Sequence, residues 1–360
     1  MSEFKPGLEG VVAFETEIAE PDRDGGALRY RGVDIEELVG DVSFEKVWGL
    51  LVDDSPEPGL PVADPYRPQG LTGHAPADLQ AVTAHLGAEW DLGQLIDISD
   101  AQAEDDLRRL SATMISVVAQ SARVADGHTT PVDAAVVAQG QTAAERFLLE
   151  WRGEVDPTHV RAIDTYWICT AEHGLNASTF TARIVASTGA DCAAALSSAV
   201  GALSGPLHGG APARVLPMLD AAAAADSVEG YVLQVLDSGE RLMGFGHRVY
   251  RAEDPRARLL RGTAKELGSP RFAVAEELEQ VALAELHRRK PDRVLATNVE
   301  FWSAVVLDVA DIPPKLAPAM FACSRTAGWS AHIMEQKRLG RLVRPAAKYV
   351  GPGARSLASV

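Results

Sequence analysis

Three of the nine histidines lie in corners of the chain that are bordered by glycine. They are His173 in AEHGLN, His208 in GPLHGG and His247 in GFGHRVY. Glycine lets a ligand approach the backbone closely, and loops carry catalytic groups more often than regular elements do. A histidine in such a corner can bind an anion, donate a hydrogen bond to a carbonyl group or transfer a proton near neutral pH. Each histidine taken alone is more simply a structural residue, but three in the same kind of setting are harder to explain in that way.

Two arginines occupy positions where a positive charge needs compensation. The segment EDPRAR predicts a helix that begins at Asp254 and places Arg256 in its first turn, where the helix dipole disfavours a cation. Arg325 lies four residues after Phe321 and four before Trp329, on the apolar stripe of another predicted helix. A guanidinium on that stripe must find a carboxylate, either from the protein or from a substrate. Arg256 indicates an anion site, although an ordinary surface arginine is the alternative.

Glu300 stands at the start of a predicted apolar helix in TNVEFWSAVVL, with Asn298 as its expected cap. An acid in the first turn is stabilised by the helix dipole and by itself indicates no more than a helix start. It becomes of interest only in the company of the three histidines and the arginines.

Charge and composition exclude several classes of function. The formal net charge of -16 disfavours broad attraction to nucleic acid or to anionic membranes, so any anion must be bound locally. No apolar run approaches the roughly 18 to 20 residues that span a bilayer, and the N-terminal MSEFKPGLEG lacks the features of a secretion signal, so we expect a cytoplasmic protein. The three cysteines show no CxxC spacing, which predicts buried, reduced thiols rather than disulfides or a zinc site.

The periodicity of apolar residues predicts a mostly helical chain after a short hairpin. Residues 10–32 contain β-like runs around the turn PDRDGG, and residues 34–52, 101–125 and 135–151 show the three- and four-residue spacing of amphipathic helices. Residues 54–77 are rich in Pro, Asp and Gly and are expected to form a surface connection without chemistry. Residues 176–205 predict closely packed helices with Asn176 or Ser178 as a cap and Gly189 as a stop.

A change of character at Gly209, where mixed-charge helices begin, marks a candidate second domain. With 360 residues, of which 46% are hydrophobic, the chain is long enough for a large domain and a smaller one. We therefore predict an all-α fold, with residues 1–208 and 306–360 in the large domain and residues 209–305 in the small domain.

Taken together, these segments resemble the citrate synthase family over nearly the whole chain. The resemblance is carried by GALRYRGVDIEELV, EHGLNASTFTARIVAST, GPLHGGA, GFGHRVYRAEDPR, NVEFW, RTAGWSAHIMEQ and RLVRPAAKYVGP, and it is weakest between about residues 54 and 105. It implies an all-α fold with a large domain and a smaller mobile domain that closes on the substrate, usually in a homodimer.

The resemblance also implies a role for each candidate residue. Oxaloacetate would be held by Arg256, Arg325 and Arg344, with His173 helping to bind it and His247 polarising its ketone. The family pattern makes Arg344 a contribution from the neighbouring subunit, so the homodimer would complete each site.

For the second substrate, the resemblance makes Glu300 the base that removes a methyl proton from acetyl-CoA and His208 the donor to the thioester oxygen. The backbone at Gly244 and Gly246 would lie against CoA, and Arg251 would meet a phosphate. No metal and no permanently bound cofactor are implied, because acetyl-CoA is a co-substrate. The chain departs from the family at Glu300, where aspartate is usual, and at Ala346, where a basic residue is common.

Three alternatives stay open at this level. A 2-methylcitrate synthase would use propionyl-CoA through the same chemistry, and one extra methylene discriminates weakly. A metal-dependent hydrolase could use His173, His208, His247 and Glu300, although the sequence has no compact HExxH helix and the arginines would repel a cation. A non-catalytic or weakened binding protein could retain the fold, since a fold alone does not establish a function.

Overall fold

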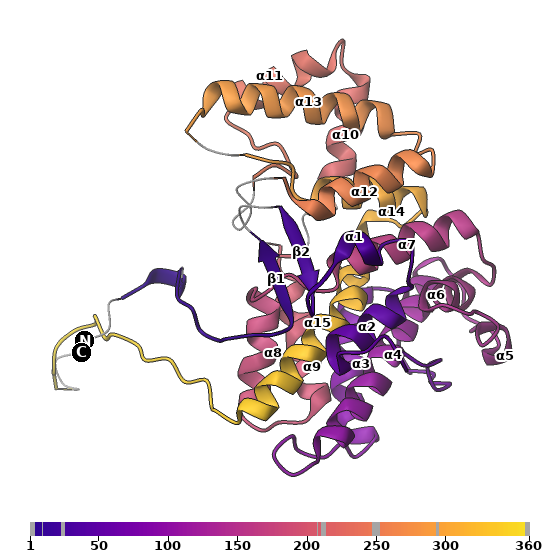
Figure 1. The fold of residues 1–360 in the computed structure, drawn as a ribbon, viewed down its shortest axis with the longest axis vertical. Helices are drawn as coiled ribbons and strands as arrows, with labels where there is room; N and C mark the ends of the chain where they lie inside the picture. Colours follow the sequence, from indigo (N-terminus) through magenta and orange to yellow (C-terminus); the bar gives the residue numbers. More distant parts are fainter. Residues whose placement is uncertain are drawn as a thin grey trace.

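The computed structural model describes residues 4–8, 10–22, 26–206, 208–209, 214–246, 253–292 and 295–356. Figure 1 shows a mostly helical molecule with one small sheet, as the sequence predicts. The sheet is antiparallel and has the order β1-β2-β3. Its strands are β1 Ala19–Asp22, β2 Ala27–Tyr30 and β3 Val33–Asp34. The predicted hairpin is confirmed in the pairing of β1 with β2, whereas residues 11–16 form no strand.

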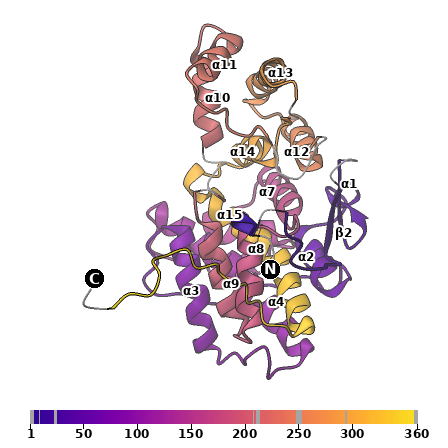
Figure 2. The ribbon, with the colours of Figure 1, turned by 90° about the vertical axis from the view of Figure 1, so that its left-hand side faces the viewer.

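The helices fall into two groups in Figures 1 and 2. The larger, lower group contains α1 Ile35–Leu38, α2 Phe44–Asp53, α3 Ala75–Glu89, α4 Asp100–Ala125, α5 Ala134–Val137, α6 Ala143–Arg152, α7 Pro157–Thr170, α8 Ala177–Ser187, α9 Cys192–Leu203 and α15 Ala317–Leu339. The upper group contains α10 Val215–Ala224, α11 Val228–Asp237, α12 Pro255–Glu266 and α13 Phe272–Arg289. Helix α14 Val299–Val309 lies where the groups meet, against both α12 and α7. Short 3-10 helices cover Pro6–Leu8 and Pro314–Leu316.

The two groups of helices do not by themselves fix the boundaries of the predicted domains. The predicted boundary at residue 208 falls beside residues 207 and 210–213, which lie outside the described part of the chain. The assignment of residues 1–208 and 306–360 to one domain and 209–305 to the other therefore stays a prediction.

Helix α15 is the central element of the lower group. It contacts α2, α4, α7, α8 and α9, and both ribbon views show it running through the middle of these helices. Most of its residues between Ala317 and Gln336 are buried, including the polar Arg325, His332 and Gln336. A helix surrounded on all sides must satisfy its polar groups inside the protein, because water does not reach them. Polar side chains on α15 therefore mark places where partners or ligands converge.

Two of the predicted helices are broken. The segment 34–52 divides into α1 and α2 around Gly40, whose φ of 95° is a left-handed conformation that ends a helix. The segment 135–151 divides into α5 and α6, and Thr142 forms a capping box with Glu145 at the start of α6. The apolar spacing continues across both breaks, so periodicity alone could not reveal them. Residues 54–74 contain no helix or strand, but α3 begins at Ala75, inside the predicted connection.

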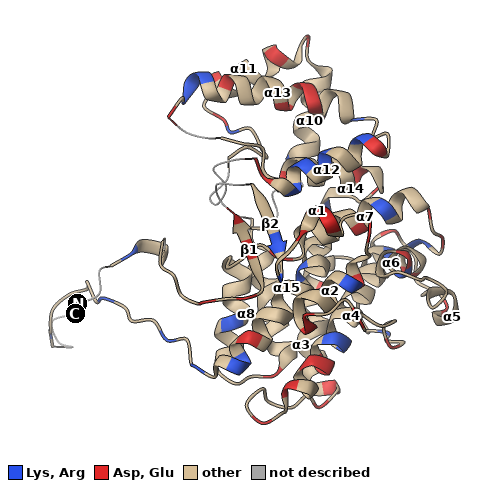
Figure 3. Cartoon of the chain, viewed as in Figure 1, with Lys and Arg blue, Asp and Glu red and all other residues tan. Residues whose placement is uncertain are grey.

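Other sequence-based predictions can be compared directly. The three cysteines are buried free thiols, as predicted: Cys169, Cys192 and Cys323. Among the described residues, the helices are all too short or too polar to cross a bilayer. In Figure 3, acidic and basic residues are interspersed along the helices of both groups. This mixture agrees with the expectation that an anion must be bound at a local site.

Candidate active site

The corner that carries His208 is a tight turn after α9. The N–H of His208 donates to the carbonyl of Gly205 (3.0 Å), and the N–H of Gly209 donates to the carbonyl of Leu203 (2.9 Å). A Cβ atom at position 209 would lie 2.6 Å from the Leu203 oxygen, so a larger residue would force the turn apart. Glycine is needed here for close backbone approach, which explains one of the two glycines after the histidine.

The imidazole of His208 is held by Ser178, at the start of α8. Its Nε2 lies 2.9 Å from Ser178 Oγ, and the ring packs edge-on against Phe321 with centroids 6.1 Å apart. The same hydroxyl accepts from Trp329 Nε1 (3.2 Å) and lies 2.9 Å from Asn176 Oδ1. Burial, and then the positive charge of Arg325, lower the pKa of His208 to about 4. The ring is therefore neutral at pH 7 and can act as a hydrogen-bond donor without carrying charge.

Arg325 is a buried cation without an acid in contact. Its side chain is 2% exposed, its Nε donates to the Thr170 carbonyl (2.9 Å), and its guanidinium lies 4.8 Å from the centre of the Phe321 ring. Within the described part of the chain, no carboxylate forms an ion pair with it, and its buried Nη1 has no hydrogen-bond partner. The charge of the buried Glu172 favours the charged form of Arg325, but Nη1 of the guanidinium has no hydrogen bond to any acid among the described residues and is left for a substrate carboxylate.

Arg256, in contrast, is paired within the chain. Its Nε and Nη2 donate to the two carboxylate oxygens of Asp254, at 2.9 and 2.8 Å. Asp254 is fully buried, caps α12, and also accepts from the N–H of Val299 (3.1 Å), which joins the starts of α12 and α14. The unfavourable position of Arg256 in the first helical turn is thus compensated by the capping residue itself. This pair weakens the argument that the helix dipole alone indicates an anion site there.

Glu300 lies in the first turn of α14, at a junction with the segment around Gly246. Asn298 caps the helix by accepting from the N–H of Glu300 (3.0 Å), as predicted, and its side chain donates to the Gly246 carbonyl (3.1 Å). The N–H of Gly246 donates to the carbonyl of Ala296 (2.8 Å), and that of Asn298 to the carbonyl of Gly244 (2.9 Å). This pairing places the predicted CoA-contacting glycines beside the predicted base.

Burial raises the pKa of the Glu300 carboxyl to about 7, although the positive charge of Arg256 acts in the opposite direction. A carboxyl group with a pKa near 7 is half ionised at neutral pH and is basic enough to accept a proton from carbon more readily than an ordinary glutamate. Glu300 is therefore suited to the work of a general base.

The charges of the candidate residues affect one another's pKa values, which favours one shared site for four of them. The charge of Arg325 acts on His208, and the charge of Arg256 acts on both Arg325 and Glu300. These residues come from α12, α14, α15 and the turn after α9. The site thus combines two arginines, a neutral imidazole and an acid with a raised pKa, where the two groups of helices meet.

The whole chain matches a known family. The family profile described as "Citrate synthase, C-terminal domain" matches residues 7–64 and 66–346. A Mycobacterium tuberculosis protein named "Putative citrate synthase 2" is 60% identical, covering 99% of this chain and 95% of its own. The chain belongs to the citrate synthase family. Members of this family are acyltransferases that convert the acyl group into an alkyl group on transfer.

Further relatives share the family and the fold. The citrate synthase of Haloferax volcanii is 36% identical and covers 97% of this chain and 96% of its own. The crystal structure of citrate synthase from Pyrobaculum aerophilum superposes with a TM-score of 0.82 at 30% identity, covering 98% of this chain and 95% of its own. The Thermoplasma acidophilum enzyme, solved with carboxymethyl coenzyme A and oxaloacetate, has a TM-score of 0.76 at 25% identity and full coverage of both chains.

The remaining residues predicted from the family resemblance have different outcomes. His173 lies half-buried in the turn between α7 and α8, next to the fully buried Glu172. His247 and Arg251 lie outside the described residues, so the structure does not place them. Arg344 is exposed, in the segment after α15 that runs away from the helices in Figure 1. The structure therefore does not bring Arg344 to the other candidates within one chain, and its family role stays a prediction.

Sequence reasoning missed two side chains that hold the candidate residues in place. The sequence predicts Ser178 only as an alternative helix cap, whereas in the structure its hydroxyl contacts His208. The sequence predicts Asp254 as a cap, and the structure adds its contacts with Arg256 and with the α14 backbone. The Asp254–Arg256 spacing was a usable signal, since a capping carboxylate faces the first turn. No signal in the sequence links Ser178 to a histidine 30 residues away.

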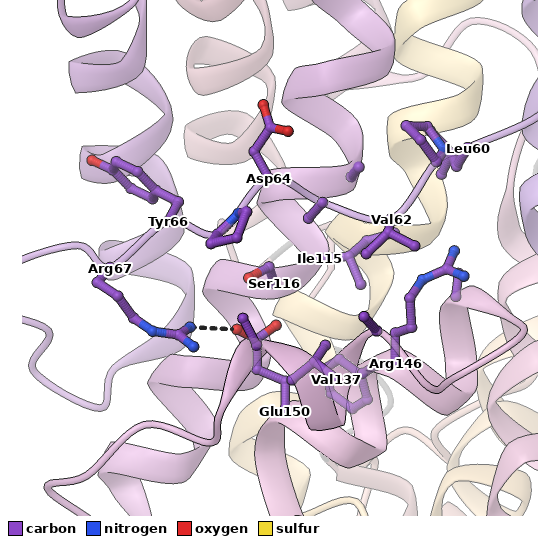
Figure 4. A pocket seen from close by; sticks show the side chains of 18 residues that line it. Leu60, Val62, Asp64, Tyr66, Arg67, Ile115, Ser116, Val137, Arg146 and Glu150 are labelled. Carbon is purple, nitrogen blue, oxygen red and sulfur yellow. Dashed lines mark hydrogen bonds and ion pairs between the residues drawn. The ribbon is translucent and has the colours of Figure 1, made fainter.

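The apolar pocket of Figure 4 is a different feature of the molecule. It has a volume of about 260 Å³ and lies under residues 60–67, between that segment and helices α4, α5 and α6. Its buried Glu150 is paired with Arg67 at 2.9 Å, as the dashed line shows. None of the predicted site residues lines it. The candidate active site is therefore identified by its charged side chains and not by this pocket.

Proposed function

We propose that this protein is a citrate synthase that condenses acetyl-CoA with oxaloacetate and water to give citrate and CoA. The observation that carries the proposal is the buried guanidinium of Arg325, which has no acid partner among the described residues, beside a neutral imidazole and a glutamate with a raised pKa. A substrate carboxylate would accept from the Nη1 that no protein group in the described part of the chain contacts. The weakly acidic methyl group of acetyl-CoA needs both the base and the donor.

Oxaloacetate binds through its two carboxylates in this proposal. Arg325 takes one carboxylate, and Arg256 helps to hold the other beside Asp254. Arg344 comes from the neighbouring subunit, His173 helps to bind, and His247 donates to the ketone oxygen. Because Arg256 and Arg325 lie on helices of the two groups, a dicarboxylate between them would draw these groups together.

The condensation begins when Glu300 removes a methyl proton from acetyl-CoA. Negative charge develops on the thioester oxygen, and a hydrogen bond from the neutral His208 stabilises it. For this donation the Ser178 hydroxyl must turn its one proton from Asn176 Oδ1 to His208 Nε2, which leaves the imidazole proton on Nδ1 for the thioester oxygen. The enol carbon then attacks the ketone carbon of oxaloacetate, and the ketone oxygen takes up a proton. Water hydrolyses the resulting thioester and releases citrate and CoA.

The proposal includes the partners and the setting of the reaction. Acetyl-CoA is a co-substrate that lies against Gly244 and Gly246 with Arg251 on a phosphate, and no permanently bound cofactor or metal takes part. Within the described ranges, no three His, Cys, Asp or Glu side chains are placed to hold a metal ion. The metal-dependent hydrolase therefore gains no support from these residues. A homodimer in the cytoplasm completes the proposal.

Activity should depend on pH through Glu300. A base works only when deprotonated, so kcat/KM for acetyl-CoA should rise about tenfold per pH unit below about pH 7 and level off above it. His208, with a pKa near 4, is neutral throughout this range. Initial rates measured between about pH 5 and pH 9 test this expectation. A profile that is flat across pH 7 would assign the rate-controlling proton transfer to another group.

The release of CoA tests the function itself. We expect thiol release from acetyl-CoA to depend on oxaloacetate, with kcat/KM for acetyl-CoA roughly 10-fold or more above that for propionyl-CoA. A preference for propionyl-CoA would identify a 2-methylcitrate synthase. Calorimetric binding of oxaloacetate without thiol release from either thioester would instead indicate a catalytically weakened binding protein.

A further inference from the structure

A row of buried ionisable side chains runs behind the candidate site, and the proposed reaction does not use it. Glu172, which is fully buried, has its Oε1 3.3 Å from Nε2 of His332. The other ring nitrogen of His332, Nδ1, lies 3.0 Å from Nη1 of Arg183. The same Nη1 donates to Oε2 of Glu335 at 2.5 Å. The row thus connects the turn between α7 and α8 with helix α8 and the last turns of α15.

The chemistry of these groups determines the tautomer of His332. A guanidinium has only donors, so Nδ1 of His332 must be the acceptor in its contact with Arg183. The ring proton is then on Nε2, which donates to the carboxylate of Glu172. His332 is therefore a neutral bridge between the anion Glu172 and the cation Arg183.

Glu172 is fitted closely into this position. Its carboxylate lies against Gly328 of α15, where any Cβ atom would collide with its Oε2. Its carbonyl accepts from the hydroxyl of Tyr30 (3.1 Å). Burial raises the pKa of Glu172, but the hydrogen bond from His332, the positive charge of Arg325 and the backbone N–H of His173 together hold that pKa below its ordinary value. The carboxylate is therefore ionised, and it stabilises both the turn that carries His173 and the charge of Arg325.

The opposite end of the row holds the two terminal segments. Arg183 donates from Nε to Oε1 of Gln336 (3.1 Å), and Nε2 of Gln336 donates to the carbonyl of Arg341 (2.8 Å). Glu335 accepts from the N–H of Glu17 through Oε1 (3.0 Å). The segment that leads to Arg344 therefore starts from the same row that ends beside His173.

We propose that Glu172, His332 and Arg183 are positioning residues for oxaloacetate, an inference that rests on the proposed function. Buried charges are costly, and replacing a buried ion pair by apolar residues is often neutral for stability. A role in holding the substrate-binding residues in position explains why these charged groups are buried. The row fixes the backbone at His173 and keeps near Arg325 an anion whose charge offsets part of the cost of burying the guanidinium.

Calorimetric titration of oxaloacetate tests this inference without requiring turnover. In His332→Leu, Glu172 loses its side-chain donor, and we expect the Kd of oxaloacetate to rise roughly 10- to 100-fold, as for other supporting shells around a site. The kcat at saturating substrates should change by less than about threefold, because the reacting groups remain. His332→Gln should bind oxaloacetate nearly as wild type does, since its carboxamide has an NH₂ group that can donate to Glu172 and a carbonyl oxygen that can accept from Arg183.

Two further variants make the test decisive. Glu172→Gln keeps the shape but removes the charge, and it should also weaken oxaloacetate binding, so it decides the question if His332→Leu does not fold. Gln120→Leu is the matched control, because Gln120 is a buried hydrogen-bonding residue of α4 with no contact to the row. Its oxaloacetate affinity should equal that of wild type.

The outcomes separate this inference from the proposed function. Equal oxaloacetate affinity in wild type, His332→Leu and Glu172→Gln overturns the positioning role, as does a glutamine variant at position 332 that binds as weakly as the leucine variant. A wild-type protein that neither binds oxaloacetate nor releases CoA contradicts the proposed function, whatever the variants do.

Discussion

Replacement of Glu300 by glutamine is expected to lower kcat by roughly 10²- to 10⁴-fold, the usual contribution of a general base. Glutamine has nearly the same size as glutamate, and the capping contact from Asn298 involves only the backbone of residue 300. Helix α14 should therefore form as before. The amide cannot accept the methyl proton, so the step that begins the condensation is lost.

The sharpest measurement is the exchange of acetyl-CoA methyl protons with solvent in the presence of an oxaloacetate analogue. This exchange isolates proton removal from carbon–carbon bond formation, and Glu300→Gln should abolish it. The affinity for oxaloacetate should stay nearly unchanged, because Arg325 and Arg256 are intact. Near-normal turnover of Glu300→Gln would remove Glu300 from the mechanism.

The comparison with Glu300→Asp tests how the site accommodates an acid longer than the family's usual aspartate. A misplacement of about 1 Å can cost on the order of 100-fold in rate. If the backbone or the acetyl position has adjusted to glutamate, Glu300→Asp should also lose rate. A faster aspartate variant would instead show that the site is still shaped for the shorter acid.

Mixing two inactive variants is expected to restore activity if Arg344 acts across the subunit boundary. In a heterodimer of Arg344→Ala and His208→Ala chains, one site carries both defects and the other carries neither. Random exchange makes half of the dimers mixed, so the specific activity should recover to about a quarter of the wild-type value. Each variant alone should be nearly inactive, since it lacks a substrate cation or the donor to the thioester.

The structure motivates this experiment because Arg344 is exposed in a segment that leaves the helices of its own chain. Chain exchange must be verified, for example with two affinity tags. A mixture of His208→Ala with Glu300→Gln is the control, because both residues belong to the same chain's site. Every site of that heterodimer keeps one defect, so this mixture should recover no activity. It would recover activity only if His208 and Glu300 came from different subunits. No recovery in the Arg344 mixture, after proven exchange, would place Arg344 outside the neighbouring site.

Local features of the sequence were sufficient for the helical fold and for several element boundaries. Asn176, Asp254 and Asn298 cap the helices at which they were predicted, because a capping side chain bonds to backbone only two or three residues away. The hairpin of β1 and β2 followed in the same way from a turn and its flanking residues. The family motifs named the candidate residues, and the family itself is confirmed by the profile match.

Tertiary structure decided what the partners of those residues are. The sequence placed Arg325 on an apolar stripe, but only the fold showed that no acid among the described residues pairs with it. It also paired Arg256 with Asp254, brought Ser178 to His208, and joined Glu172, His332 and Arg183 into one buried row. Periodicity and capping report on neighbours along the chain. The charge state and orientation of a buried side chain depend on residues that are distant in sequence, and only packing determines which of them come into contact.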